Sequence, residues 1–117
     1  MLIKGSITAL VTPMKEDSSI DYESLKNLIN FQIDNGIDGI VAVGTTGESA
    51  TIDFEDHIKL IEFFVRESDN RVPIIAGTGA NSTEEAIILT KAAKTIGADA
   101  ALLVSPYYNK PPQEGLL

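Results

Sequence analysis

Short apolar runs alternate along the chain with longer amphipathic stretches. Four apolar runs rich in β-branched residues predict buried strands at residues 7–11, 39–43, 72–76 and 100–104. Between them, apolar positions recur three and four residues apart, which predicts three amphipathic helices. The three apolar stripes are Leu25, Leu28, Ile29 and Ile33; Ile58, Ile61, Phe64 and Val65; and Ile88, Leu89, Ala92, Ala93 and Ile96.

Each predicted helix has start and stop signals. A side-chain oxygen at the start can accept from an unpaired amide of the first turn, and Glu85 makes the third start a capping box. The starts are Asp21, Asp53 and Ser82, and the glycine stops are Gly36 and Gly97. The order βαβαβαβ, with helices long enough to cross over, predicts parallel strands and the α/β class.

Two α/β architectures fit this order, an open doubly wound sheet and a closed (β/α)8 TIM barrel. Small, polar or aromatic residues follow successive strands, at 44–48, 77–79 and 105–108. A doubly wound sheet concentrates its chemistry at one switch point, whereas a barrel uses the ends of all its strands. The pattern therefore favours the barrel.

The length corresponds to about half of such a barrel. A complete barrel needs eight strands and roughly 250 residues, and the 117 residues here hold four predicted strands and three helices. We therefore expect residues 1–117 to be the truncated N-terminal half of a TIM-barrel domain. Such a half exposes two strand edges and an inner face of Val, Ile and Ala, so it should belong to a longer polypeptide or self-associate.

The composition limits the kinds of partner that the chain is expected to bind. The chain is 44% hydrophobic and 22% charged, as expected of a globular protein, and its net charge of −8 disfavours nucleic acid. Cysteine is absent, and no apolar run approaches the roughly 18 residues of a membrane span. We expect a cytoplasmic protein that binds neither nucleic acid nor membrane.

Two glycine-containing segments could bind a ligand. In residues 44–51, the hydroxyls of Thr45 and Thr46 and nearby amides could hold a carboxylate, or the segment could be only a tight turn. Residues 77–79 lack the third glycine of a dinucleotide fingerprint. Asn81 and Glu85, one helical turn apart, could line a polar pocket, although the pattern alone favours a capping role.

Other candidate groups are Tyr107, Tyr108 and His57. A phenol at a strand end can donate or relay a proton, whereas paired aromatics more often anchor packing or an interface. His57 is the single histidine, and we expect it to be solvated or to act as a cap on the second helix. Without a His or Cys companion it predicts no metal site.

Four segments together resemble the dihydrodipicolinate synthase family, within the wider group of N-acetylneuraminate lyase and other Schiff-base aldolases. They are residues 5–13, 44–51, 75–81 and 106–111, in the family's order. The resemblance implies an enzyme, without a cofactor, that condenses pyruvate with aspartate semialdehyde in lysine and diaminopimelate biosynthesis through a Schiff base. It also implies a homodimer or homotetramer.

The resemblance also implies roles for individual residues. Thr45 would relay protons, Thr46 would bind the pyruvate carboxylate, and Tyr108 would be a relay tyrosine lent to the neighbouring subunit. Many bacterial members bind lysine as an inhibitor at the dimer interface, and Phe54 stands where some lysine-sensitive members carry a second His. The positions that match this lysine site are Ser49, Ala50, His57, Asn81, Glu85 and Tyr107.

In the family, the Schiff-base lysine, a further relay tyrosine and a carboxylate-binding arginine come from the second half of the barrel. The resemblance therefore implies that this chain alone is inactive. One alternative is a non-catalytic module that keeps the dimer-interface and lysine-binding segments. Another is a small flavodoxin-like domain, which predicts an anion site at the first or second strand end.

Overall fold

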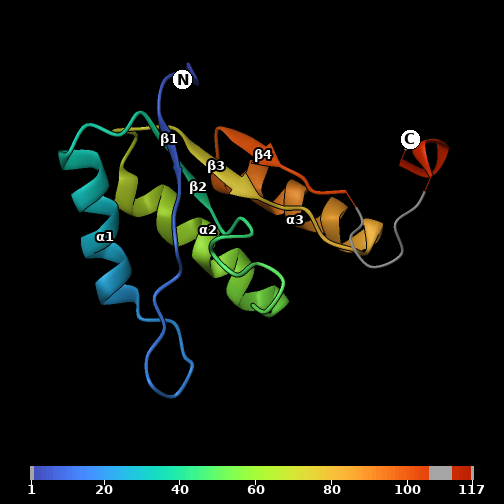
Figure 1. Cartoon of the computed structure of the whole chain (residues 1–117), viewed down its shortest axis with the longest axis horizontal. Coiled ribbons are helices and arrows are strands. Elements are labelled where there is room, and N and C mark those ends of the chain that lie inside the picture. Colours follow the sequence, from blue (N-terminus) through green and yellow to red (C-terminus); the bar gives the residue numbers. More distant parts are fainter. Residues whose placement is uncertain (1, 106–111, 117) are drawn as a thin grey trace.

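One parallel sheet organises the chain in the computed structural model, which describes residues 2–105 and 112–116. The strands β1 (Ile7–Ala9), β2 (Gly39–Ala42), β3 (Ile74–Gly77) and β4 (Ala100–Leu102) lie side by side in chain order. The helices α1 (Tyr22–Asp34), α2 (Phe54–Ser68) and α3 (Thr83–Ile96) join them, and the 3-10 helix η1 (Gln113–Leu116) follows (Figure 1).

The sheet order decides between the two architectures. A doubly wound sheet reverses its strand order at a switch point, which would place β1 inside the sheet. Here β1 is an edge strand and β1-β2-β3-β4 is strictly sequential. The α/β class with parallel strands is confirmed, and the doubly wound and flavodoxin-like alternatives are wrong.

The observed strands are shorter than the apolar runs that predicted them. Strand β3 starts at Ile74 because Pro73 has no amide to donate to a ladder, although its carbonyl accepts from the Ile40 amide at 3.1 Å. Strands β1 and β4 each pair with one neighbour, and they end at Ala9 and Leu102.

The predicted helix starts are confirmed. The carboxylates of Asp21 and Asp53 accept from the amides of Ser24 and Asp56 at 3.0 and 2.9 Å. The Ser82 hydroxyl accepts from the Glu85 amide at 3.4 Å. These bonds satisfy amides that the first helical turn leaves without a partner.

The helix ends agree with the glycine signals to within two residues. Gly97 caps α3 in the left-handed conformation, with φ 107°. Helix α1 ends at Asp34 with Asn35 as its cap, and Gly36 follows with φ 87°. Glycine adopts this conformation without a Cβ clash, so the chain can turn back toward the next strand.

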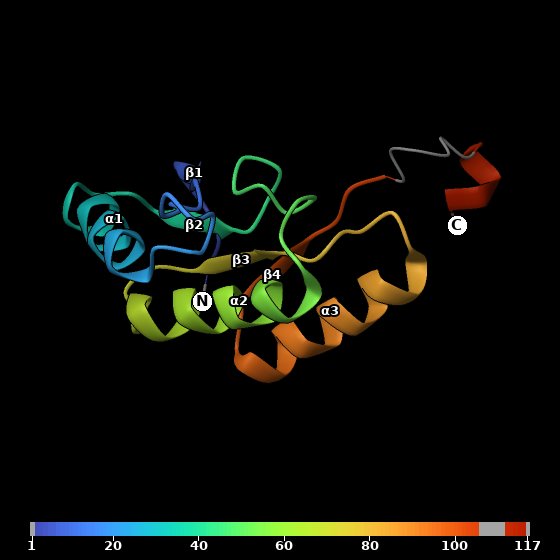
Figure 2. The ribbon, with the colours of Figure 1, turned by 90° about the horizontal axis from the view of Figure 1, so that it is seen from below.

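The helix-covered face of the sheet is closely packed. Ile40, Ala42, Ile74 and Ala76 alternate along the two central strands and are almost completely buried. Helix α2 contributes Leu60, Ile61 and Phe64 to the same core, and α2 and α3 lie on one side of the sheet (Figure 2).

The α3 stripe is partly wrong, because Ile88 is 45% exposed. Its neighbours Leu89 and Ala93, four residues apart, form the buried row of this helix. Ile88 lies about 100° around the helix from Leu89, since α-helices have 3.6 residues per turn.

The opposite face of the sheet is open. The strand register aligns Ala9, Val41, Ile75 and Ala100 on this face. Val41 and Ile75 are only half-buried, and Leu102 in β4 is 45% exposed. The predicted open inner face is therefore present in the described chain.

Candidate functional site

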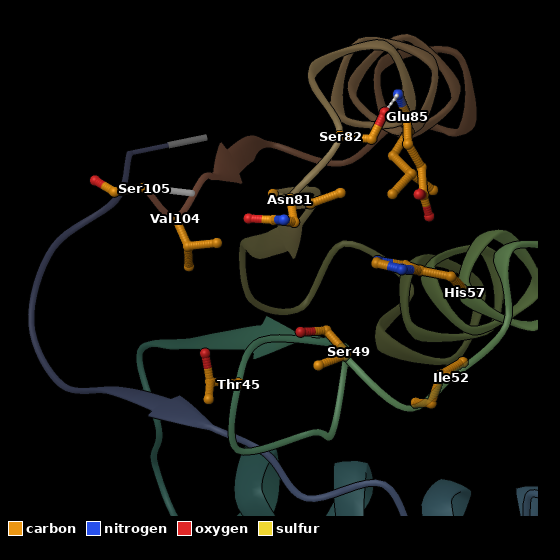
Figure 3. Close-up of a pocket in the computed structure, with 13 residues that line it drawn as sticks. Thr45, Ser49, Ile52, His57, Asn81, Ser82, Glu85, Val104 and Ser105 are labelled. Carbon is orange, nitrogen blue, oxygen red and sulfur yellow. Dashed lines mark hydrogen bonds between the residues drawn. The ribbon is translucent and has the colours of Figure 1, made fainter. Parts of the chain in front are cut away.

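A cavity of about 650 Å³ lies at the carboxyl ends of β2, β3 and β4. Parallel strands place these ends at one edge of the sheet, so three loops that are distant in sequence meet there. Thr45 and Ser49, from the loop after β2, face Asn81 and Val104 across the space (Figure 3). The described residues that line it are Thr45, Ser49, Ala50, Ile52, His57, Gly79, Ala80, Asn81, Ser82, Glu85, Leu89, Val104 and Ser105.

The loop after β2 is a compact turn. The amides of Glu48 and Ser49 donate back to the carbonyls of Thr45 and Gly44 at 3.0 and 3.3 Å. Val43 enters the turn with φ 56°, an uncommon and costly conformation for a β-branched residue. The turn exposes the side chains of Thr45 and Thr46; Thr45 lines the cavity, and Thr46 is not one of the lining residues.

Thr12, which lies in the segment after β1, forms a hydrogen bond to this loop. Its buried hydroxyl donates to the Gly47 carbonyl at 2.7 Å across 35 residues of sequence. A methyl group on Gly47 would lie 3.1 Å from the Leu10 carbonyl oxygen and from Thr12 Oγ1, so the turn approaches the β1 end closely. The sequence did not predict this role, because the bond joins residues 35 positions apart.

His57 is buried, so the expectation of a solvated or capping residue is wrong. Its Nε2 lies 2.5 Å from the Gly77 carbonyl oxygen. Because a carbonyl only accepts, Nε2 carries the proton in this bond. Burial lowers the pKa of His57, and the Gly77 carbonyl and the Glu85 carboxylate act in the opposite direction.

The start of α3 supplies a second polar group to the cavity. Ser82 and Glu85 both take part in the helix cap and also line the cavity, so capping and pocket formation occur together. Asn81 lines the same space just before the helix. Glu85 is the one acidic side chain among the described residues of the lining, and its carboxylate suits a ligand that carries an ammonium group.

The positions predicted for a lysine site mostly meet here. Ser49, Ala50, His57, Asn81 and Glu85 all line the cavity with Thr45. Tyr107 and Tyr108 lie outside the described residues, and their roles stay predictions. Val104 and Ser105, which precede them, line the cavity.

Several lining residues were not predicted. Ile52, Leu89 and Val104 are apolar, and an apolar side chain at a pocket looks like any core residue in the sequence. Gly79 allows a close approach of the chain, because a methyl group there would lie 2.4 Å from the Val104 amide nitrogen.

The described part of the chain has neither a cluster of metal-binding side chains nor a membrane-spanning helix. Within residues 2–105 and 112–116, no group of three or more His, Cys, Asp or Glu side chains is placed to hold a metal ion. Among the same residues, no helix has the length and apolar character needed to cross a bilayer.

The sequence profile of the dihydrodipicolinate synthetase family matches residues 2–117. The chain belongs to this family. It is 62% identical over 115 residues to the 4-hydroxy-tetrahydrodipicolinate synthase of Alcanivorax borkumensis, and 60% identical to that of Geotalea uraniireducens. These alignments cover 98% of this chain but 39% of each relative, so the chain spans about two fifths of the length of these curated synthases.

Solved synthase structures match the fold as well as the sequence. The dihydrodipicolinate synthase of Acinetobacter baumannii, solved with pyruvate, is 60% identical and superimposes with a TM-score of 0.95 over 98% of this chain and 40% of that one. The enzyme from Cyanidioschyzon merolae, solved with lysine bound, is 44% identical with a TM-score of 0.89, over 95% and 38% of the two chains. The predicted half of a TIM barrel is confirmed.

Proposed function

We propose that the chain forms part of a Schiff-base lyase that condenses pyruvate with aspartate semialdehyde in lysine and diaminopimelate biosynthesis. The observation that carries this proposal is the position of Thr45. Its side chain borders a cavity built from three strand ends, on a chain 60% identical to a synthase solved with pyruvate. Barrel enzymes place their chemistry at this end of the sheet.

The residues of the turn after β2 have complementary roles in this reaction. Thr45 relays a proton between the substrate and a tyrosine, for which we propose Tyr108. Thr46 holds the pyruvate carboxylate, since an exposed hydroxyl beside glycine amides can donate to an anion. Pyruvate is activated by condensation with a lysine, which turns its carbonyl into an electron sink.

We propose that the 117-residue chain does not catalyse this reaction alone. The synthase of Alcanivorax borkumensis is more than twice as long as this chain. The family resemblance assigns the Schiff-base lysine to the part of the barrel that this chain does not match. The active enzyme would be a cytoplasmic homodimer or homotetramer. The open face of the sheet, which bears Val41 and Ile75, supports this proposal. An apolar sheet face of this kind is normally covered by other parts of a protein.

Turnover in a completed barrel tests the proposal. The 115 matched residues would be joined to the remaining part of the Alcanivorax borkumensis synthase. We expect pyruvate-dependent consumption of aspartate semialdehyde, and trapping of pyruvate by borohydride in the completed barrel but not in the 117-residue chain. A folded but inactive completed barrel, or an adduct on the short chain, would contradict the proposal.

A matched pair of threonine variants tests the catalytic role. Thr45→Val removes the hydroxyl at the cavity and should lower kcat about 100-fold or more, the usual loss for a proton-transfer group. Thr95→Val removes a hydroxyl that bonds the Lys91 carbonyl on the exposed surface of α3, and should leave kcat unchanged. Equal kcat values in the two variants would remove Thr45 from the mechanism.

A second candidate function is lysine binding, as regulator of the enzyme or as the remaining activity of a non-catalytic module. The observation in its favour is that Ser49, His57, Asn81 and the Glu85 carboxylate converge on one cavity. Glu85 would accept from a ligand ammonium group, and the polar side chains nearby would orient it. The relative from Cyanidioschyzon merolae solved with lysine supports this proposal.

Calorimetry with lysine and with pyruvate separates the two candidates. Heat with lysine alone on the 117-residue chain supports the binding module. Glu85→Gln should weaken lysine binding by about 10- to 100-fold, since a bond to a charged group contributes about 1.5–3 kcal/mol. The control is Glu84→Gln, an exposed carboxylate in the same helical turn that does not line the cavity, and it should bind lysine normally.

A further inference from the structure

Thr12 differs from the other polar residues near the cavity, because it is 4% exposed and does not line the space. Its hydroxyl donates at 2.7 Å to the carbonyl of Gly47, which is the last residue of the Gly44-Thr45-Thr46-Gly47 segment. The bond joins the segment that follows β1 to the loop after β2. It therefore ties the threonine pair to this segment.

The backbone of this loop adopts an unfavourable conformation, so it needs contacts from outside the loop to hold it. Val43 before the threonine pair and Glu48 after it both have positive φ angles, of 56° and 63°. Non-glycine residues adopt this conformation at a cost, and they keep it only where surrounding contacts hold it. The Gly47 carbonyl lies between these two residues and is fixed by Thr12.

The position of Gly47 also sets that of Thr45. The Glu48 amide, which belongs to the same peptide unit as the Gly47 carbonyl, donates to the Thr45 carbonyl at 3.0 Å. One peptide unit thus accepts from Thr12 on one side and donates to Thr45 on the other. A shift of this unit would move Thr45 relative to the cavity.

We infer that Thr12 is a positioning residue, which acts through the Gly47–Glu48 peptide to hold Thr45 and Thr46 in their reactive geometry. This inference rests on the proposed function, since it assigns the threonine pair to catalysis. Thr12 itself is buried and does not line the cavity. Its hydroxyl matters because an isosteric side chain without a donor leaves the Gly47 carbonyl without this bond.

Two variants isolate the hydroxyl. Thr12→Val keeps the shape and removes the donor, whereas Thr12→Ser keeps the donor. In the completed barrel, with active sites counted by borohydride trapping of pyruvate, we expect Thr12→Val to lower kcat about 10- to 100-fold, because small misplacements of reacting groups have effects of this size. Thr12→Ser should stay within about threefold of the parent. Thr12→Ala replaces Thr12→Val if the latter does not fold.

Hydrogen exchange on the 117-residue chain measures the same bond without any turnover. Peptides covering residues 44–51 should exchange up to about tenfold faster in Thr12→Val than in the parent or in Thr12→Ser, the equivalent of one lost hydrogen bond. Peptides from α3 should be unchanged. Unchanged exchange in residues 44–51 would overturn the positioning role.

The two measurements distinguish this inference from the proposed function. An inactive completed parent contradicts the proposed function, and the exchange data then still decide whether Thr12 holds the loop. An active parent with equal kcat per trapped site in Thr12→Val overturns the inference and leaves the proposed function standing. A purely structural Thr12 would lower the fraction of folded protein without changing kcat per site.

Discussion

The two ends of the sheet use their polar side chains differently. At the amino ends of the strands, Asp38 accepts from the Ser6 amide at 2.8 Å and Asp99 accepts from the Ile74 amide at 2.9 Å. At the carboxyl ends, Thr45, Ser49 and Glu85 border a cavity of about 650 Å³. These carboxylates at the amino end bond the backbone beside them, whereas the three side chains at the carboxyl end line a cavity.

The amino-end arrangement is repeated. Asp38 follows Gly36-Ile37 and Asp99 follows Gly97-Ala98, so in both cases a left-handed glycine is followed two residues later by a carboxylate. Each carboxylate bonds a backbone amide of the strand beside it or of the residue just before that strand. Substitutions of these carboxylates should therefore change stability alone, whereas substitutions of the polar side chains that line the cavity should change binding or catalysis.

The largest expected effect follows from Gly77, where the carboxyl end of β3 supports the turn after β2. A methyl group on Gly77 would lie 2.3 Å from the Val43 carbonyl oxygen and 3.0 Å from Gly44 Cα, both backbone atoms. Gly77→Ala should lower the free energy of unfolding by about 3 kcal/mol or more, because the turn must move. Urea denaturation measures this change.

Gly36→Ala is the matched control at the amino end. A methyl group there meets no atom within 4 Å, although φ is +87°. Only the backbone conformation opposes the substitution, so the loss should be about 1–2 kcal/mol. Equal losses at the two glycines would contradict close packing of β3 against the turn.

A smaller effect is expected at Asp99. Asp99→Ala leaves the Ile74 amide without its carboxylate partner and should cost about 1–3 kcal/mol of unfolding free energy. Asp99→Asn keeps an acceptor and should cost less. Lysine affinity measured by calorimetry should be the same in both variants, and a loss of affinity in either would break the division between the two ends.

The smallest effect concerns the pH dependence of stability through His57. Burial is the main cause of its lowered pKa, so the unfolded chain binds a proton more readily than the folded one. Stability should therefore fall as the pH drops below the ordinary value of 6.5 toward the lower folded pKa. His57→Gln keeps a donor for the Gly77 carbonyl and should remove this part of the pH dependence.

NMR can follow His57 directly, because it is the only histidine in the chain. Its ring resonances should titrate below pH 6.5 in the folded protein. A midpoint at or above that value would mean that the Gly77 carbonyl and Glu85 outweigh burial.

Local patterns predicted the secondary structure well, because local physics sets it. Apolar periodicity and the capping residues Asp21, Asp53 and Ser82 gave the helices, and the βα order gave parallel strands. The boundary at Pro73 also has a local cause, the missing amide. Ile88 was wrongly assigned to the buried stripe of α3. Periodicity shows where apolar side chains lie around a helix, but not which of them another element packs against.

The site was predictable only where a motif marked it. The threonine turn and the Asn81–Glu85 segment were identifiable, and parallel topology brings their strand ends together. The bond between Thr12 and Gly47 spans 35 residues, and the burial of His57 depends on the packing of α2 against β3, so neither left a local pattern. Tyr107 and Tyr108 remain predictions.

The division between the two ends can be tested by NMR mapping of lysine binding on the 15N-labelled 117-residue chain. We expect saturable shifts of the amide resonances of residues 44–51 and 79–85, and no shifts for residues 36–39 and 97–100. In Glu85→Gln, the shifts of residues 44–51 and 79–85 should be lost. Saturable shifts at the amino ends, or no shifts at the carboxyl ends, would contradict the assignment of the cavity as a ligand site.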